Sequence, residues 1–159
     1  PIACGIAAAL RLKGNTTSRV YTIMGDGEQS EGSIWEAVSN AVHYKLGNIV
    51  GIVDFNGFEA DGAIDDITGL GDIAEKYRAF GWNVVEIDGN NIKVIVDCLD
   101  NLPKASSITP TVIIAHTVKG KGVPFMENQA RWHAGKITNE QLTESTQKLI
   151  NEYESRWDS

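Results

Sequence analysis

The sequence predicts an α/β domain: a doubly wound parallel sheet with helices on both faces. Four largely apolar stretches, at residues 20–24, 49–53, 82–87 and 111–115, alternate along the chain with helical patterns. Strands of this kind, lacking the polar alternation of a half-exposed strand, are typical of parallel sheets buried on both faces. We expect one domain over residues 1–159, without an internal repeat or a linker.

Helices are expected where apolar residues recur about every 3.6 positions. An Ala-rich helix is predicted at 3–13, stopped by Gly14, and a longer one from about Ser33 to Leu46. Ser33 and Glu36 have the spacing of a capping box, and Gly47 is expected to cap the carboxyl end. Three further helices follow from the apolar stripes Leu70, Ile73, Ala74, Tyr77 and Phe80; Ile92, Ile95, Val96 and Leu99; and Leu142, Thr146, Leu149, Ile150, Tyr153 and Trp157.

Composition excludes several classes of function. Fourteen Lys and Arg against 21 Asp and Glu give a net charge of -7, which disfavours binding to nucleic acid or to an anionic membrane. The two cysteines, Cys4 and Cys98, match no metal-ligand spacing and are expected to be inert thiols of a reducing compartment. No apolar run approaches the roughly 18 residues of a membrane span, so a cytoplasmic location is expected.

The first residues form a helical pattern at once. The sequence opens at Pro1 without Met, and no strand precedes the helix. We therefore expect a fragment or a subunit of a larger enzyme.

Candidate site residues lie in the turns that follow three of the predicted strands, where ligands of parallel sheets bind. These turns are Gly25-Asp26-Gly27, Asp54-Phe55-Asn56-Gly57 and the loop that starts at His116. Asp26 and Asn56 supply oxygen ligands but too little charge to hold a divalent cation alone, which implies Mg²⁺ shared with a phosphate-bearing molecule. The glycines beside Asp26 let the backbone approach such an anion closely.

Each of these features has a simpler interpretation. A Gly-Asp-Gly turn often only ends a strand, although its pairing with Asn56 beyond a second strand is less common by chance. Lys119 and Lys121 either neutralise phosphate or belong to a solvated loop. His43 and His116 are expected to be structural or solvent-facing.

Gly25-Asp26-Gly27, followed thirty residues later by Asn56, resembles the thiamine-diphosphate binding motif. The segment Glu31-Gly32-Ser33-Ile34-Trp35-Glu36-Ala37 is similar to the version found in transketolases. The likeness extends over nearly the whole chain, through Asp61-Gly62, Ala79-Phe80-Gly81-Trp82, Asp88-Gly89, His116-Thr117-Val118-Lys119-Gly120-Lys121-Gly122 and Trp132-His133.

The resemblance implies a role for each matching position. Asp26, the side chain of Asn56 and the backbone carbonyl of Phe58 would ligate Mg²⁺. Gly25 and Gly27 belong to the diphosphate-binding turn, with the Gly27 amide on the diphosphate, and His133 would reach toward the diphosphate and the substrate. Glu31 and Glu36 fall where transketolases place carboxylates that link two active sites at the dimer interface, although Glu36 is also explained as the capping partner of Ser33.

The implied protein is the half of a transketolase that binds diphosphate and Mg²⁺ and transfers a two-carbon ketol unit between sugar phosphates. Nothing in the sequence resembles the pyrimidine-binding domain of the family, so that domain is expected from a partner, in a homodimer or heterotetramer. Asp88-Gly89-Asn90-Asn91 departs from the Asp-Gly-His-Asp of many relatives. Two alternatives stay open: another thiamine-diphosphate enzyme, such as a deoxyxylulose-phosphate synthase, and an inactive assembly module.

Overall fold

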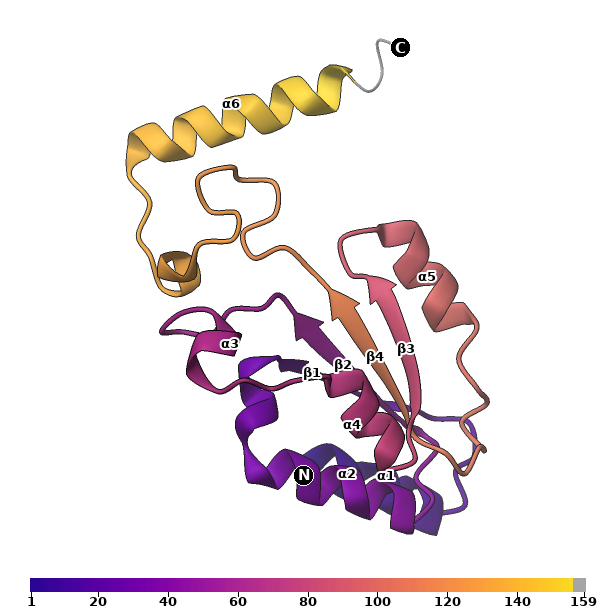
Figure 1. Cartoon of the computed structure of the whole chain (residues 1–159). Coiled ribbons are helices and arrows are strands. Elements are labelled where there is room, and N and C mark those ends of the chain that lie inside the picture. Colours follow the sequence, from indigo (N-terminus) through magenta and orange to yellow (C-terminus); the bar gives the residue numbers. More distant parts are fainter. Residues whose placement is uncertain (156–159) are drawn as a thin grey trace.

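The computed structural model describes residues 1–155, which form a four-stranded parallel sheet with the order β1-β2-β4-β3. The strands are β1 (Val20–Gly25), β2 (Ile49–Phe55), β3 (Asn83–Asp88) and β4 (Thr111–His116). Six α-helices and two 3-10 turns connect and flank them (Figure 1). They are α1 (Ile2–Leu12), η1 (Gly27–Ser30), α2 (Gly32–His43), α3 (Ile64–Ile67), α4 (Ile73–Ala79), α5 (Ile92–Asp100), η2 (Ala130–His133) and α6 (Asn139–Ser155). The predicted parallel α/β fold is confirmed.

The strand order places helices on both faces of the sheet. The connections from β1 to β2 and from β2 to β3 run in one direction along the sheet, whereas the connection from β3 back to β4 runs in the opposite direction. Because such crossovers are right-handed, α2 and α4 lie on one face and α5 on the other. This is the doubly wound arrangement expected from the sequence.

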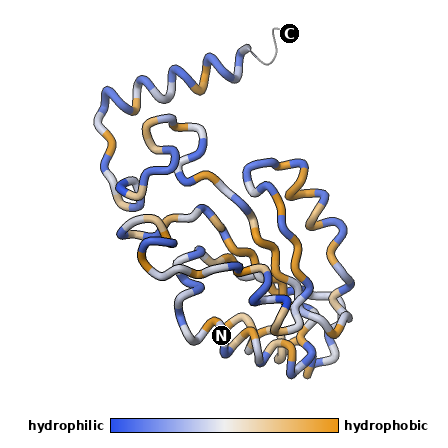
Figure 2. The backbone as a smooth tube through the Cα atoms, in the orientation of Figure 1, coloured by the Kyte–Doolittle hydropathy of each residue, from blue (hydrophilic) through white to orange (hydrophobic). Residues whose placement is uncertain are grey.

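The main core lies between the sheet and the face that carries α1, α2 and α4. Burial of these apolar side chains is the dominant favourable term for the fold, and Figure 2 shows apolar residues concentrated along the strands. The members include Ala7, Ile34, Val38, Ala41, Ile49, Val53, Ile73, Tyr77, Trp82, Val112 and Ile114.

Both predicted caps of α2 are wrong. Glu31, not Ser33, is the N-cap residue, and no side-chain hydrogen bond caps the helix. At the other end the helix stops at His43, and Lys45 takes the left-handed conformation with φ 55°. Glycine is required at position 47 for a different reason: a Cβ atom there would lie 2.1 Å from the carbonyl oxygen of Ser107.

The remaining elements agree with the sequence except at their ends and in the loops. Leu70 and Phe80, expected on one helix, flank α4. The short elements α3, η1 and η2 were not anticipated, because a single turn carries no periodic pattern. Figure 1 shows α6 apart from the sheet, beyond the loop that follows β4; Trp157, assigned to this helix from the sequence, lies outside the described residues. Within residues 1–155, none of the helices has the length and apolar character to cross a membrane.

Candidate functional site

The carboxyl ends of β1, β2 and β4 meet at one edge of the sheet, as expected for parallel strands. Gly25 pairs in register with Asp54, and Phe55 pairs with His116. The loop after β4 is held there by the Thr117 backbone N–H, which donates to the Phe55 carbonyl at 3.0 Å, and by the Thr117 hydroxyl, which donates to Asp54. All three candidate turns therefore open on the same side.

Asp26 joins the first two turns directly. Its Oδ2 accepts hydrogen bonds from the backbone N–H of Asn56 at 2.9 Å and of Gly57 at 2.6 Å, and its Oδ1 accepts from Gly27 N–H at 2.9 Å. The residue is only 2 % exposed. Three backbone N–H groups thus donate to the two oxygens of this buried side chain.

The position of Asp26 follows from the ladder between β1 and β2. Val20 N–H donates to the Asn48 carbonyl, so the backbone groups of every second residue of β1 point toward β2. On the other strand, the amide of Asp54 points toward β1, and the next amide to do so belongs to Asn56. The carbonyl of Asp26 is already engaged by Gln29 N–H in η1. The Asp26 side chain therefore accepts the hydrogen bond from Asn56 N–H in place of the Asp26 carbonyl. This bond connects the end of β1 to the end of β2.

Asn56 and Phe58 shape the second turn. Asn56 Oδ1 accepts from Phe58 N–H at 3.0 Å, in an Asx turn. Phe58 forms an antiparallel bridge with Ala63, in which Glu59 donates to Gly62 and Ile64 donates to Gly57. In this pattern the N–H and the carbonyl of Phe58 both point away from Ala63, toward the side on which Asn56 lies.

These donors fit a hard divalent cation. Asp26 is a buried carboxylate whose hydrogen bonds all come from backbone amides, and Asn56 Oδ1 and the Phe58 carbonyl oxygen lie on the adjoining turn. Nowhere in residues 1–155 do three His, Cys, Asp or Glu side chains gather as metal ligands. Three protein oxygens leave half of an octahedron to phosphate and water, which is how Mg²⁺ is usually held.

The turn itself is close-packed. A Cβ atom on Gly27 would lie 3.2 Å from both Cβ and Oε2 of Glu59, so a larger residue would press against the second turn. This observation gives Gly27 a steric reason to be glycine, in addition to its amide.

Gln29 was missed by the sequence analysis. It is 1 % exposed, its Nε2 donates to the Gly25 carbonyl at 3.3 Å, and its Oε1 accepts from the Tyr77 hydroxyl at 2.9 Å. Trp35 Nε1 donates to its carbonyl at 2.8 Å. Burial raises the pKa of Tyr77 well above its usual value, which keeps the phenol protonated as a donor. A glutamine inside a polar turn carries no periodic signal, so only the structure could reveal this anchor.

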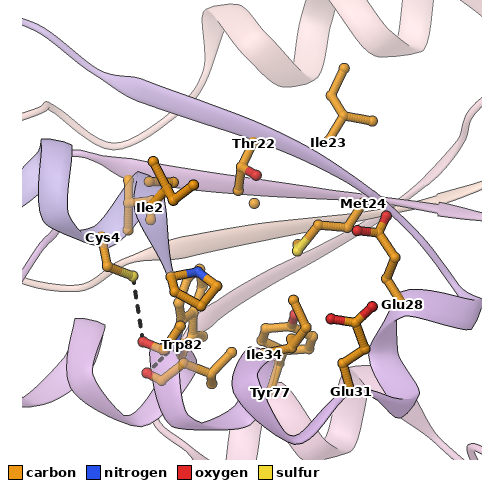
Figure 3. Close-up of a pocket in the computed structure, with 16 residues that line it drawn as sticks. Ile2, Cys4, Thr22, Ile23, Met24, Glu28, Glu31, Ile34, Tyr77 and Trp82 are labelled. Carbon is orange, nitrogen blue, oxygen red and sulfur yellow. Dashed lines mark hydrogen bonds between the residues drawn. The ribbon is translucent and has the colours of Figure 1, made fainter.

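Glu31 and Glu36 lie at the two ends of the first turn of α2 and both are exposed. Glu31 lines a cavity of about 250 Å³ between β1, α1 and α2, together with Glu28, Met24, Ile34 and Tyr77. Figure 3 shows Glu28 and Glu31 at the same end of this cavity. Glu36 lines a smaller cavity of about 130 Å³ with Pro1 and Cys4.

His133 lies on η2, in the long loop after β4, and its Nδ1 is 3.3 Å from Lys119 Nζ. The fold brings Asp26 and Asn56 together, since they are hydrogen-bonded to each other. Within residues 1–155, no hydrogen bond joins His133 to either of them. The loop is anchored by Val118 N–H, which donates to Asn90 Oδ1 at 2.8 Å.

The other two histidines contact side chains outside the turns of Asp26 and Asn56. His43 ends α2, is exposed and packs edge-on against Tyr44. His116 Nε2 lies 3.2 Å from Glu86 Oε2, and Arg78 contacts the other oxygen of Glu86 at 2.9 Å. Hydrogen bonds from Arg78 and then from His116 lower the pKa of Glu86.

Both cysteines are free and partly buried. Burial raises the pKa of the Cys4 and Cys98 thiols, which disfavours the reactive thiolate. This agrees with their expected inertness.

Comparison with known proteins places the chain in a family. The family model described as "Transketolase, thiamine diphosphate binding domain" matches residues 9–156. The chain belongs to the transketolase family. It is 42% identical over 144 residues to a transketolase family protein of Sinorhizobium fredii, covering 91% of this chain and 51% of that protein. It is 35% identical over 154 residues to an apulose-4-phosphate transketolase subunit of Phocaeicola vulgatus, covering 96% and 54%.

Solved structures agree with this assignment. The transketolase of Campylobacter jejuni superposes with a TM-score of 0.82 at 27% identity, over 92% of this chain and 24% of that one. The chain thus spans about half the length of the curated transketolase relatives it matches, and a quarter of this longer enzyme. It carries the thiamine-diphosphate binding domain of the transketolase family.

Proposed function

We propose that this chain is the half of a transketolase that holds the diphosphate of thiamine diphosphate through Mg²⁺. Completed by a pyrimidine-binding half, it would transfer a two-carbon ketol unit between sugar phosphates. The observation that carries the proposal is the buried Asp26 carboxylate, which accepts hydrogen bonds from Asn56 and Gly57 across two strand ends.

The residues divide the task among them. Asp26, Asn56 Oδ1 and the Phe58 carbonyl would hold Mg²⁺, and the amide of Gly27, at the start of η1, would bind the diphosphate. Thiamine diphosphate supplies, when bound, the carbon nucleophile for ketol transfer. His133, with Lys119 beside it, would contact the diphosphate and the substrate from the loop after β4. Glu31 and Glu36 would face a second protomer and connect two sites.

The names of the relatives support a partner. Two of the similar proteins are named as subunits of transketolases, and this chain spans about half of each. We assign the pyrimidine-binding part to a second half or subunit, in a homodimer or heterotetramer, located in the cytoplasm.

Cofactor binding tests the first part of the proposal. Thiamine diphosphate with Mg²⁺ is expected to raise the melting temperature of the assembled protein, since a ligand at 100 times its Kd stabilises by about 2.7 kcal/mol. Thiamine with Mg²⁺, or thiamine diphosphate with a chelator, should leave it unchanged. Equal shifts with and without the diphosphate would contradict the site.

Two-carbon transfer tests the second part. We expect turnover of a ketose phosphate and an aldose phosphate only after this chain is combined with a pyrimidine-binding half. Measurable turnover by the 159-residue chain alone would refute the division of labour.

A further inference from the structure

Glu28 lies beside the proposed metal site without being one of its ligands. It belongs to the first turn of η1, is exposed, and its Oε2 accepts a hydrogen bond from the backbone N–H of Gly25 at 2.6 Å. The turn between these two residues contains Asp26 and Gly27, the proposed ligand and the proposed diphosphate contact. A bond from Glu28 back to Gly25 therefore closes a ring around the functional part of the turn.

Both backbone groups of Gly25 point away from β2. Val20 N–H donates to the carbonyl of Asn48, just before β2, so by alternation the N–H and the carbonyl of Gly25 point to the other side of β1. Among residues 1–155, no strand pairs with β1 on that side. Within this part of the chain, side chains are therefore the partners available to these two groups.

Two consecutive side chains of η1 bond to these two groups. Glu28 accepts from the Gly25 N–H, and Gln29 donates to the Gly25 carbonyl at 3.3 Å. Gln29 is itself fixed by the Tyr77 hydroxyl in the core. The peptide groups on both sides of Gly25 are thereby held by side chains of the protein itself.

We infer that Glu28 is a positioning residue, which holds the Gly-Asp-Gly turn in the conformation that presents Asp26 to the cation. The inference rests on the proposed function and adds a residue to it. A carboxylate bonded to an amide is a strong, charge-assisted contact, and preorganised ligands bind with a smaller loss of conformational entropy. Gln29 anchors the same turn from the buried side, while Glu28, whose side chain is exposed, acts from the other side.

Cation affinity provides the main test. In the assembled protein with thiamine diphosphate, Mn²⁺ binding is measured by electron paramagnetic resonance as a probe for the Mg²⁺ site. Glu28→Ala is expected to weaken binding about tenfold, whereas Glu28→Gln, which keeps an acceptor oxygen, should stay within about threefold of the wild type. Glu144→Ala, an exposed glutamate of α6, is the control with the same change in charge.

A second measurement needs no cofactor. Hydrogen exchange of residues 24–31 in the cofactor-free protein should become faster in Glu28→Ala and remain unchanged in Glu28→Gln and Glu144→Ala. Unaltered exchange and Mn²⁺ affinity in Glu28→Ala would overturn the inference, as would equal weakening in Glu28→Gln, which would assign the effect to charge alone. A wild-type protein that binds no cation with the cofactor would overturn the proposed function instead, while the exchange experiment still reports on Glu28.

Discussion

The Asp26 carboxylate bonds to the backbone of Asn56, thirty residues further along the chain, at 2.9 Å. Two turns that are far apart in sequence thus share one acidic side chain. This buried side chain satisfies the amides at the end of the β1–β2 ladder. In the proposed function it would also supply negative charge to the bound Mg²⁺.

Replacing Asp26 should separate these two contributions. Asp26→Asn keeps one acceptor oxygen but removes the charge, so we expect Mg²⁺-dependent cofactor binding to fall by more than about 100-fold. The amide group also presents a donor to one of the three N–H groups, which should lower the free energy of unfolding by about 1–3 kcal/mol. Calorimetry and urea denaturation measure the two effects. Asp66→Asn, at an exposed position on α3, should change neither.

Tyr77 should stabilise the domain through its hydroxyl. Tyr77→Phe leaves the buried Oε1 of Gln29 without its donor, and we expect a loss of about 1–2 kcal/mol in the free energy of unfolding. Tyr44→Phe is the matched control, since Tyr44 is 62% exposed and its loss of a hydroxyl should matter by less than about 0.5 kcal/mol. Equal midpoints in urea for the two variants would show that the hydroxyl of Tyr77 contributes nothing.

Gly47 should tolerate no side chain. The Cβ atom of Gly47→Ala would lie 2.1 Å from the backbone of Ser107, so the loop must move, and we expect a destabilisation of more than about 2 kcal/mol. Gly5→Ala provides the contrast: no atom lies within 4 Å of its added Cβ in the middle of α1, and the helix should gain about 0.5–1 kcal/mol. Thermal denaturation of both variants checks the opposite signs.

Glu86 should contribute to stability in a manner that depends on pH. Its pKa is lower in the folded state than in the unfolded chain because of Arg78 and His116. Its contribution is therefore fully present above the unfolded pKa and is lost as the pH falls through the folded pKa. Glu86→Gln should lower the melting temperature slightly at neutral pH, and the difference from the wild type should vanish in acid. A difference that stays constant across this range would argue against the ion pairs.

The sequence was sufficient to predict the strands and the meeting of their ends. Continuous apolar runs determine which segments are buried, and parallel pairing then brings the turns of Asp26 and Asn56 to one edge. The caps of α2 were not predictable in the same way. Ser33 and Glu36 have the spacing of a capping box, but the tight η1 turn places Glu31 at the N-cap position.

Other features depend on contacts between segments that are distant in the sequence. Gly47 was assigned to a helix end, yet its constraint comes from Ser107, sixty residues away. Gln29 likewise gains its importance from Tyr77, a partner that no local pattern identifies. Such residues look ordinary in sequence because their neighbours are supplied only by the fold.

The register of β1 and β2 determines where the two turns of the candidate site lie. Gly25 and Asp54 are aligned because Val20 and Ile49, at the other end of the strands, are aligned. A shift of one residue would displace the acidic group by about 3.3 Å and turn its strand over. In the proposed function, aliphatic residues at the far end of the sheet would therefore help to position the metal ligands, and substitutions among them should impair coordination as well as folding.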